Sequence, residues 1–455
     1  MRLRIDALIL IGVNQSMDFA ESVKYLYSLG HEVLAAKYGL ETINLLLDRL
    51  GRPQRSFKSI IVAGTNGKGS VSAMIYSIAR AAGHRTALFT SPHLVRIQER
   101  IRFNDVEISE AEFARVATLV RQAGEALVAA GQLSAPPTFF EQIAAIALCY
   151  FRDCGTELAV LEVGLGGRLD ATNAVDRLIS VITAIDLDHQ NILGDTVEQI
   201  AAEKAAIIVP GARAVLGRQH YREASDVLMR RCLETNVLPV FANEATNTET
   251  SDFGRIAFDY DSARSNYASV KIGLRGRHQA DNAATAIEAV ELLDESGFAI
   301  PRDAIIKGLR DVNWPGRLEL IDERPAILLD GAHNPGGAKS LRMYLNEFWH
   351  GSITLVFGAM NDKDIGRMAT ELFDVASTIV LTRVKDSRAA DSAKLGAAAL
   401  RSSRNVIFAE TVKQALSWAR SVTPAEGLIC VAGSLHLVGE VKRLMEEEDS
   451  QAAVL

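Results

Sequence analysis

Residues Ile60–Ser70 read IIVAGTNGKGS, and this stretch decides the fold. Four apolar residues, mostly β-branched, lead into a glycine-rich loop with one lysine, and an alanine-rich helical pattern follows over Val71–Ala82. A strand, a tight loop and a helix start point backbone N–H groups and the helix dipole at a phosphate. Lys68 adds a point charge for the outer phosphates. The stretch therefore predicts a nucleotide site in an α/β protein.

The spacing of this loop differs from the usual Walker A form, which places four residues between its first glycine and its Gly-Lys pair. Here only Thr65 and Asn66 precede the Gly67-Lys68 pair. An additional glycine, Gly69, displaces the following hydroxyl by one position. A nucleotide site is expected, but not the loop of an ordinary kinase or GTPase.

Composition narrows the function classes. A chain of 455 residues is long enough for two or three domains. Its net charge of -7 argues against a nucleic-acid coat or a binder of anionic membranes, which would normally be basic. The four cysteines show no metal-finger spacing, and free thiols are typical of the reducing cytoplasm, which is the expected location. The expected partners are small molecules.

The N-terminus resembles a secretion signal at first sight. Met1–Val13 combines two arginines with a short apolar run, but Asp6 interrupts that run and it is too short to span a bilayer. We interpret residues 1–17 as an extension, with Met17 as the functional start.

The periodicity of the chain predicts an α/β fold with two domains. Helical patterns cover Asp18–Ser28 and Glu41–Leu50. Strands that alternate with helices predict a mostly parallel sheet with both faces covered. The expected strands are Ser59–Ala63, Arg85–Thr90, Leu158–Glu162 and Leu178–Ala184, followed by Ala326–Leu329, Ile353–Phe357, Thr378–Leu381, Val406–Phe408 and Leu428–Ala432.

The turn Trp314-Pro315-Gly316 separates the two strand series. We predict a P-loop ATPase domain over 18–313 and a smaller, Rossmann-like domain over 314–455. Residues 241–270 are polar and rich in Asn, Thr, Ser and Asp, and we interpret them as hairpins or a surface excursion outside the core.

Chemically distinctive stretches fall repeatedly at the carboxyl ends of the predicted strands, where open parallel sheets bind ligands. They are Gly64–Ser70, Ser91–Leu94, Glu162–Asp170, Asp186–His189 and Asp330–Asn334. The clustering predicts one site, since random polar residues would not return to the same edge.

Three residues of these stretches could carry chemistry. Glu162 ends a strand before a glycine-rich loop, and its carboxylate could hold magnesium or cap that loop. Ser91 offers a hydroxyl, although Ser-Pro pairs also initiate turns. His189 could be a structural histidine, and histidine alone does not suggest magnesium. The neighbouring Asp186 and Asp188 favour a functional interpretation.

Other candidates remain open from the residues alone. Lys204 could snorkel from an apolar helix face, or, if buried, its free amine could react with carbon dioxide to form a carbamate. Asn282 could cap a helix, Arg317 could be a solvated charge, and Asp330 could bind ribose hydroxyls or make an Asx turn. His333 follows Asp330. Candidate anion contacts of lower weight are Lys385, Arg388 and His436.

Together these motifs resemble the folylpolyglutamate synthase and dihydrofolate synthase family, a branch of the Mur-ligase-like amide ligases. The likeness extends over about residues 18–445. Its motifs are GTNGKGS (64–70), SPHL (91–94), TFFE (138–141), EVGLGGRLDATN (162–173), DH (188–189), EKAAI (203–207), HQADNAATA (278–286), WPGR (314–317), LDGAHNP (329–335) and GSLHLVGEV (433–441).

The resemblance implies an ATP-dependent carboxylate–amine ligase of folate biosynthesis and one-carbon metabolism. It would join glutamate to dihydropteroate or to a reduced folate through an acyl phosphate, and we expect both activities. The implied cofactors are ATP and Mg²⁺, with room for a monovalent cation and a carbamylated Lys204. A cytoplasmic monomer that binds neither nucleic acid nor membrane is expected, with hinge closure of the domains around ATP.

The resemblance also implies roles for individual residues. The nucleotide would contact Gly64, Thr65, Asn66, Gly67, Lys68, Gly69, Ser70, Asn282, Arg317 and Asp330. Magnesium would be held by Ser91, Glu162 and His189. The catalytic residues would be Lys68, Lys204, Arg317 and His333. The pterin-bearing substrate would contact Thr138, Phe139, Phe140, Glu141, Leu169, Asp170 and Ala171.

Two segments depart from the family pattern: Ala206 replaces a usual glycine, and AAKYGL (35–40) replaces the usual lead-in near the pterin pocket. Three alternatives remain. A Mur-type ligase of cell-wall precursors would need a separate N-terminal domain of about a hundred residues for the UDP-sugar, whereas 63 residues precede Gly64. A P-loop NTPase without ligase activity would need Walker spacing. A silent nucleotide-binding regulator would not need Lys68, Glu162, His189 and Asp330 together.

Overall fold

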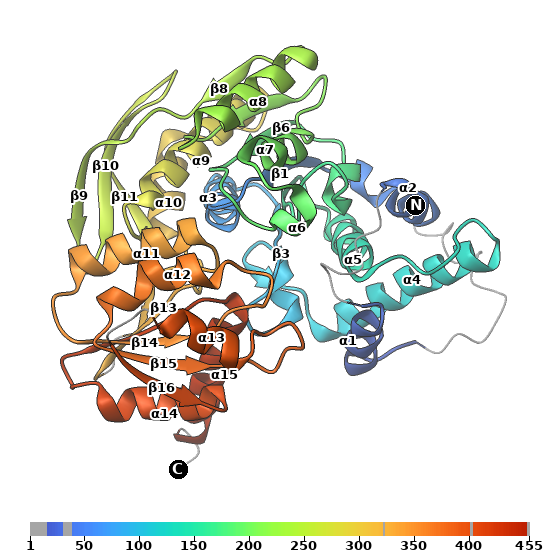
Figure 1. Ribbon diagram of the computed structural model, residues 1–455. Helices are drawn as coiled ribbons and strands as arrows, with labels where there is room; N and C mark the ends of the chain where they lie inside the picture. Colours follow the sequence, from blue (N-terminus) through green and yellow to red (C-terminus); the bar gives the residue numbers. More distant parts are fainter. Residues whose placement is uncertain (1–15, 31–38, 322–323, 401–403, 453–455) are drawn as a thin grey trace.

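The computed structural model describes residues 16–30, 39–321, 324–400 and 404–452. Most of the predicted N-terminal extension (1–15), and residues 35–38 of the atypical lead-in, lie outside the described residues. Two sheets of mostly parallel strands, each covered by helices, dominate the molecule (Figure 1). In the described part of the chain, no helix is long and apolar enough to cross a membrane.

The first sheet has eight strands in the order β4-β3-β2-β5-β1-β6-β7-β8. Its pairs are parallel from β2 to β8, whereas β3 and β4 pair antiparallel at one edge. The strands are β1 (Lys58–Ala63), β2 (Thr86–Phe89), β3 (Ile101–Phe103), β4 (Val106–Glu107), β5 (Leu158–Glu162), β6 (Ile179–Ile182), β7 (Arg213–Leu216) and β8 (Pro239–Phe241).

Strand β1 shows why an apolar run forms a central strand. Ile61 and Ala63 face one core cluster, and Ile60 and Val62 face the cluster on the opposite side of the sheet. Successive side chains of a strand point to opposite faces, so a strand that is covered on both faces must be apolar throughout. The strands predicted in this region are confirmed.

Helices cover both faces of this sheet (Figure 1). On one face lie α1 (Phe19–Ser28), α2 (Glu41–Arg49), α4 (Glu110–Ala129), α5 (Phe139–Asp153), α7 (Val197–Ala205) and α8 (Arg222–Glu234). On the other lie α3 (Lys68–Ala81), α9 (His278–Glu295) and α10 (Arg302–Asp311). The short α6 (Gln190–Leu193) precedes α7. Helix α3 begins at Lys68, three residues earlier than its apolar pattern.

The polar segment 241–270 forms hairpins as predicted, in a three-stranded antiparallel sheet. Its strands are β9 (Thr246–Ser251), β10 (Arg255–Asp261) and β11 (Asn266–Arg275). The interpretation that it lies outside the core was wrong, because Phe258 and Tyr260 are fully buried in the cluster formed with α3 and α9. Polar residues alternate with these apolar ones along β10, so average polarity concealed a buried face.

The second sheet has the order β12-β13-β17-β14-β15-β16, parallel except for β12. Its strands are β12 (Glu319–Ile321), β13 (Ala326–Leu329), β14 (Ile353–Phe357), β15 (Thr378–Thr382), β16 (Asn405–Ala409) and β17 (Leu428–Ala432). Helices α11 (Pro335–Phe348), α12 (Ile365–Leu372) and α13 (Ser392–Ala399) cover one face, and α14 (Val412–Val422) and α15 (Leu435–Ala452) the other.

The two sheets confirm the predicted fold class. The predicted domain boundary near 313–318 falls between α10 and β12, and so between the two sheets along the chain.

Candidate active site

One cavity of about 530 Å³ is lined by segments at the carboxyl ends of both sheets. From the first sheet, the segments after β1, β2, β5 and β6 line it, and from the second those after β13, β14, β15 and β17. The nucleotide, metal, catalytic and substrate residues implied by the motifs all line this cavity except Gly64, which lies against Thr183 at the base of the loop. Of the candidate anion contacts of lower weight, Arg388 and His436 line it, whereas Lys385 is exposed outside the lining. The structure therefore brings the predicted residues together.

The phosphate loop is held by backbone contacts to the end of the neighbouring strand. The N–H groups of Thr65 and Asn66 donate to the Ala184 carbonyl, at 2.9 and 3.1 Å. Gly67 precedes helix α3 with a φ of 91°, and a side chain there would collide with Asn282. No side chain caps α3, which leaves its first N–H groups available to an anion.

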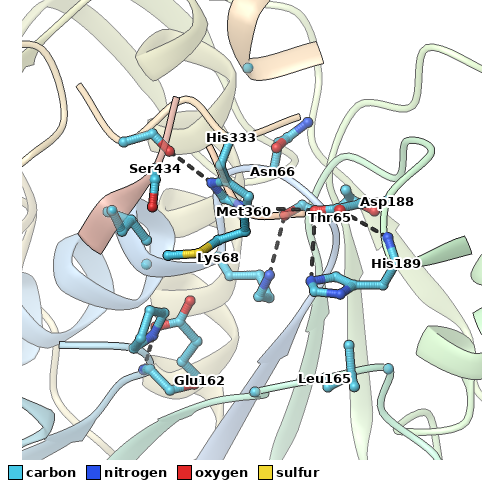
Figure 2. Close-up of a pocket in the computed structure, with 18 of the residues that line it drawn as sticks. Thr65, Asn66, Lys68, Glu162, Leu165, Asp188, His189, His333, Met360 and Ser434 are labelled. Atoms are coloured by element: carbon cyan, nitrogen blue, oxygen red, sulfur yellow. Dashed lines mark hydrogen bonds and ion pairs between the residues drawn. The ribbon is translucent and has the colours of Figure 1, made fainter. Parts of the chain in front are cut away.

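Two titratable groups of opposite sign face the cavity beside this loop, Lys68 and Glu162 (Figure 2). Burial lowers the pKa of Lys68, and nearby carboxylates oppose the shift. Burial raises the pKa of Glu162 to about 7, against the charge of Lys68. The Ser91 N–H donates to Glu162 Oε2 at 3.3 Å. A buried carboxylate with so few hydrogen bonds is a site at which a cation would relieve the cost of burial.

The predicted metal ligands fit an open cation site. Among the described residues, no group of three or more His, Cys, Asp or Glu side chains is arranged to hold a metal ion by itself. His189 Nδ1 is buried without a hydrogen-bond partner, and burial lowers the pKa of this imidazole to about 4, so the ring is neutral at pH 7. Magnesium keeps water and phosphate oxygens in its shell, which suits the three donors of Ser91, Glu162 and His189.

Asp188 connects the two sheets across the cavity (Figure 2). Its Oδ1 lies 2.6 Å from Lys363 Nζ, and its Oδ2 accepts from Asn334 Nδ2 at 3.1 Å. The same Asn334 amide also reaches Asn66 Oδ1, at 2.9 Å. Burial alone would raise the pKa of Asp188, but His333 and Lys363 hold it well below its usual value. This carboxylate is therefore ionised and joins both halves of the site.

Sequence reasoning missed Lys363 in this network, and it placed Asn334 in the distinctive stretch Asp330–Asn334 without giving it a role. Lys363 Nζ also lies 3.1 Å from His189 Nε2, which places a cation of the second sheet beside a predicted metal ligand. A signal was available, since Asp362-Lys363-Asp364 follows β14 at the same carboxyl edge as the motifs already singled out.

Replacing Lys363 by methionine should loosen the contact between the two halves of the molecule. The Lys363–Asp188 pair is buried, and losing one partner of such a pair costs about 3–5 kcal/mol. Small-angle scattering without nucleotide should therefore show a larger radius of gyration. Lys394→Met is the control, because Lys394 contacts Asn361 within the same half. Equal radii for Lys363→Met and the wild type would contradict this prediction.

The residues predicted to contact the pterin-bearing substrate begin at the N-terminus of α5. Thr138 caps this helix, and the Glu141 carboxylate accepts from the Thr138 N–H at 2.8 Å. The ring of Phe139 stacks on Tyr27, with 5.5 Å between centroids, and Phe140 packs against Gly164. The capping box shows that Glu141 has a structural task. Contact of Thr138, Phe139, Phe140 and Glu141 with substrate stays a prediction.

Asp170 also has a clear structural task. Its Oδ2 accepts from the N–H groups of Gly164 and Leu165, each at 3.0 Å, and its Oδ1 accepts from the Thr172 N–H at 3.0 Å. These bonds hold the glycine-rich loop after β5 in place. Contact of Asp170 with substrate stays a prediction, as it does for Leu169 and Ala171.

Lys204 is buried, with 5% of its surface exposed, and faces the cavity from α7. Burial and the charge of Lys68 lower the pKa of its amine to about 7. The snorkelling alternative is therefore wrong. A large fraction of this amine is unprotonated near neutral pH, which is the form that reacts with carbon dioxide.

Asn282, Arg317 and Asp330 line the cavity together with the phosphate loop. Asn282 lies inside α9 and donates to Gln279 Oε1 at 2.9 Å, so it is not a helix cap. Asp330 accepts from the N–H groups of Leu318 and Ala332, each at 2.9 Å, so the Asx-turn alternative is realised. Burial raises the pKa of Asp330, and the Arg317 charge opposes the shift.

Comparisons with known families match both halves of the chain. The Mur ligase middle domain matches residues 62–290, and the glutamate ligase domain of Mur ligases matches residues 316–435.

Curated relatives match over nearly the full chain. A probable bifunctional folylpolyglutamate synthase/dihydropteroate synthase of Haloferax volcanii is 35% identical over 94% of this chain, which spans half of that relative's length. A dihydrofolate synthase/folylpolyglutamate synthase of Bacillus subtilis is 34% identical over 92% of this chain and 97% of its own.

Solved structures of folylpolyglutamate synthases also match this chain over nearly its full length. Mycobacterium tuberculosis folylpolyglutamate synthase, complexed with ADP and AMPPCP, has a TM-score of 0.86 at 31% identity, covering 94% of this chain and 99% of that one. A bifunctional folylpolyglutamate synthase/dihydrofolate synthase with Mn, AMPPNP and L-glutamate bound has a TM-score of 0.81 at 29% identity. The match covers 96% of this chain and 100% of that one.

Proposed function

Because this chain belongs to the folylpolyglutamate synthase and dihydrofolate synthase family of ATP-dependent glutamate ligases, we propose that it joins L-glutamate both to dihydropteroate and to reduced folates. The resemblance inferred from its motifs is thus confirmed at the level of the family. The observation that carries the proposal is the shared cavity, in which Lys68 of the phosphate loop faces residues of the glutamate ligase domain. A bifunctional activity is the proposed refinement, because bifunctional proteins occur among the relatives.

The proposed nucleotide contacts follow from the placement of the residues. The phosphates would lie at the N-terminus of α3, between Lys68 and Arg317, and Asn282 and Asp330 would contact the rest of ATP. Ser91, Glu162 and His189 would hold a divalent cation, which when bound supplies charge neutralisation between phosphate oxygens.

The proposed reaction has two steps. An oxygen of the acceptor carboxylate attacks the γ-phosphorus of ATP, the bond to the β-phosphate oxygen breaks, and an acyl phosphate and ADP form. The glutamate nitrogen then attacks the acyl carbon, the bond to phosphate breaks, and an amide, inorganic phosphate and a proton are released. Catalysis by this chain consists of positioning and charge neutralisation by Lys68 and Arg317.

His333 would lie beside the transferring group. Its Nδ1 lies 2.7 Å from the Gly331 carbonyl, and its Nε2 lies 3.5 Å from Asp188 Oδ2. These contacts fix the ring plane, so His333 can orient groups at the reacting centre without rotating.

Lys204 is proposed to be carbamylated, and the modification should depend on pH. The lone pair of its amine attacks the carbon of CO₂, an N–C bond forms and one proton is released. Because the free amine becomes the major form as the pH rises through about 7, carbamate occupancy should rise from pH 6 to pH 8. ¹³C NMR of the protein in labelled bicarbonate would measure it, with Lys204→Met as the blank. A signal that is equal in both proteins would contradict the carbamate.

The activity test supplies ATP, magnesium and glutamate with dihydropteroate or tetrahydrofolate as separate acceptors. We expect a product heavier by one glutamyl residue with each acceptor, and ADP formation that depends on the acceptor. Turnover with one acceptor alone would remove the bifunctional proposal, and turnover with neither would overturn the assignment. We also propose a cytoplasmic monomer, supported for the location by four free cysteines.

A further inference from the structure

The loop between β2 and β3 of the first sheet also contacts the second domain. It contains Ser91, a proposed cation ligand, and three residues later Leu94. The side chain of Leu94 packs against the core cluster between the second sheet and helices α14 and α15. Among the described residues, Leu94 is the one member of that cluster that precedes residue 314. A side chain of the first domain is therefore docked on the hydrophobic core of the second.

Two glycines of the second domain make room for Leu94. A Cβ on Gly316 would lie 3.1 Å from Leu94 Cδ1, and a Cβ on Gly439 would collide with the Leu94 carbonyl oxygen. Gly439 lies inside helix α15, where alanine is the better helix former, and its φ is not positive. The close approach of the loop backbone, and not the conformation of the helix, therefore accounts for a glycine at this position.

The loop can pass a displacement of Leu94 on to Ser91. The Glu99 carboxylate accepts from three successive backbone N–H groups, those of residues 94–96, at 2.7, 3.0 and 2.7 Å. At the other end, the Ser91 N–H donates to Glu162 Oε2 at 3.3 Å. A stretch of four residues that is tied at both ends has little slack. A movement of Leu94 should therefore change how Ser91 sits beside the Glu162 carboxylate.

We propose that Leu94 is a positioning residue that couples the cation site to the docking of the second domain. Docked between Gly316 and Gly439, Leu94 holds Ser91 beside Glu162, so the donor set is complete only while α15 lies against the loop. This rests on the proposed function, because the cation is the one that accompanies ATP there. The coupling ties use of ATP to the docked arrangement, in which the second domain covers the reacting groups and excludes water.

The test weakens the contact from each of its two sides. Leu94→Ala removes the docked side chain, and Gly439→Ala adds a methyl group to α15 against the loop backbone. Each change should lower the fraction of molecules with a complete cation site. At saturating ATP, the free magnesium concentration for half-maximal rate should therefore rise about tenfold. At saturating magnesium, kcat should return to within about twofold of the wild type, because the cation favours the docked state.

Hydrogen exchange followed by mass spectrometry gives a second measurement that does not depend on activity. Without nucleotide or magnesium, the backbone N–H groups of residues 91–96 should exchange about tenfold faster in both variants than in the wild type, since exchange reports the undocked population. Helix α3 and strand β5 should keep their wild-type protection. A general loss of folding would instead raise exchange throughout the first domain.

Matched variants keep the outcome interpretable. Gly366→Ala makes the same change in helix α12 of the same domain, where the nearest atom, Asp364 Oδ1, would be 3.8 Å away, and should alter neither measurement. Leu94→Met keeps the volume and the apolar character and should restore most of the magnesium affinity. In the double variant of Leu94→Ala and Gly439→Ala the effects should be less than multiplicative, because both act on one contact. Circular dichroism checks the folding of each variant.

Three results would overturn the inference. The first is loop exchange equal to the wild type in both variants, which would show that docking does not fix the loop. The second is an unchanged magnesium dependence in a folded Leu94→Ala protein. The third is a kcat that stays low at saturating magnesium, which would assign Leu94 to another step. Failure of the proposed function is distinguishable, because the wild type would then form no amide product at any magnesium concentration.

Discussion

Replacing Lys68 by alanine should lower kcat for glutamate ligation by at least about a thousand-fold, the upper range for losing one group that stabilises transition-state charge. Lys68 is the first residue of helix α3 and faces the cavity. It is the one positively charged side chain in the phosphate loop, residues 64–70. Negative charge builds on the phosphate oxygens during transfer, and no other side chain of that loop can neutralise it. Hydroxylamine traps an acyl phosphate as a hydroxamate. The rate of this trapping should fall together with kcat, because both require the acyl phosphate.

The matched control is Lys58→Ala, at the opposite, exposed end of the strand that leads into the same loop. It should keep full activity. Folding of both variants is checked by thermal unfolding. Near-normal turnover in a folded Lys68→Ala protein would refute the phosphate role of this lysine.

Glu162→Gln should lower kcat by about a hundred-fold or more and raise the magnesium concentration needed for half-maximal rate. Glutamine has nearly the shape of glutamate, so packing is kept while the buried negative charge is lost. In the wild type, a proton competes for this carboxylate below a pKa of about 7. The acid limb of the wild-type rate profile should therefore move to lower pH as magnesium is raised.

In Glu162→Gln this magnesium-dependent shift of the acid limb should disappear, because the competing group is gone. Glu157→Gln is the matched control, since Glu157 lies exposed just before the same strand and pairs with Arg85. An unchanged magnesium dependence in Glu162→Gln would remove Glu162 from the cation site.

The parts of the fold that were predictable are those encoded in local patterns. The apolar run of β1, the glycines that follow it and the alanine-rich start of α3 lie within a few residues of each other, so the phosphate loop could be located from the sequence. Because open parallel sheets bind ligands at the carboxyl ends of their strands, Ser91, Glu162 and Asp330 were predicted to lie in one site. The structure finds them in one cavity.

What could not be predicted depends on contacts between distant segments. Whether Lys204 snorkels or is buried is decided by the packing of α7, not by its own sequence. The pairing of Asp188 with Lys363 joins residues 175 positions apart. The charged run Asp362-Lys363-Asp364 at a strand end marks Lys363 as a candidate, but its pairing with Asp188 depends on how the two sheets pack. The buried face of β10 was concealed for a different reason: its polar residues alternate with the apolar ones, and only the sheet's contact with α9 shows which face is covered.

The central claim is that the acceptor carboxylate is activated by phosphorylation, and isotope transfer tests it most directly. An acceptor labelled with ¹⁸O in the reacting carboxylate is incubated with ATP and glutamate, and the released inorganic phosphate is analysed by mass. When glutamate attacks the acyl phosphate, the bond between the acyl carbon and the bridging oxygen breaks, and phosphate departs with that oxygen of the former carboxylate. We therefore predict one ¹⁸O in each phosphate released. Unlabelled phosphate, formed at the same rate as the amide, would contradict the account.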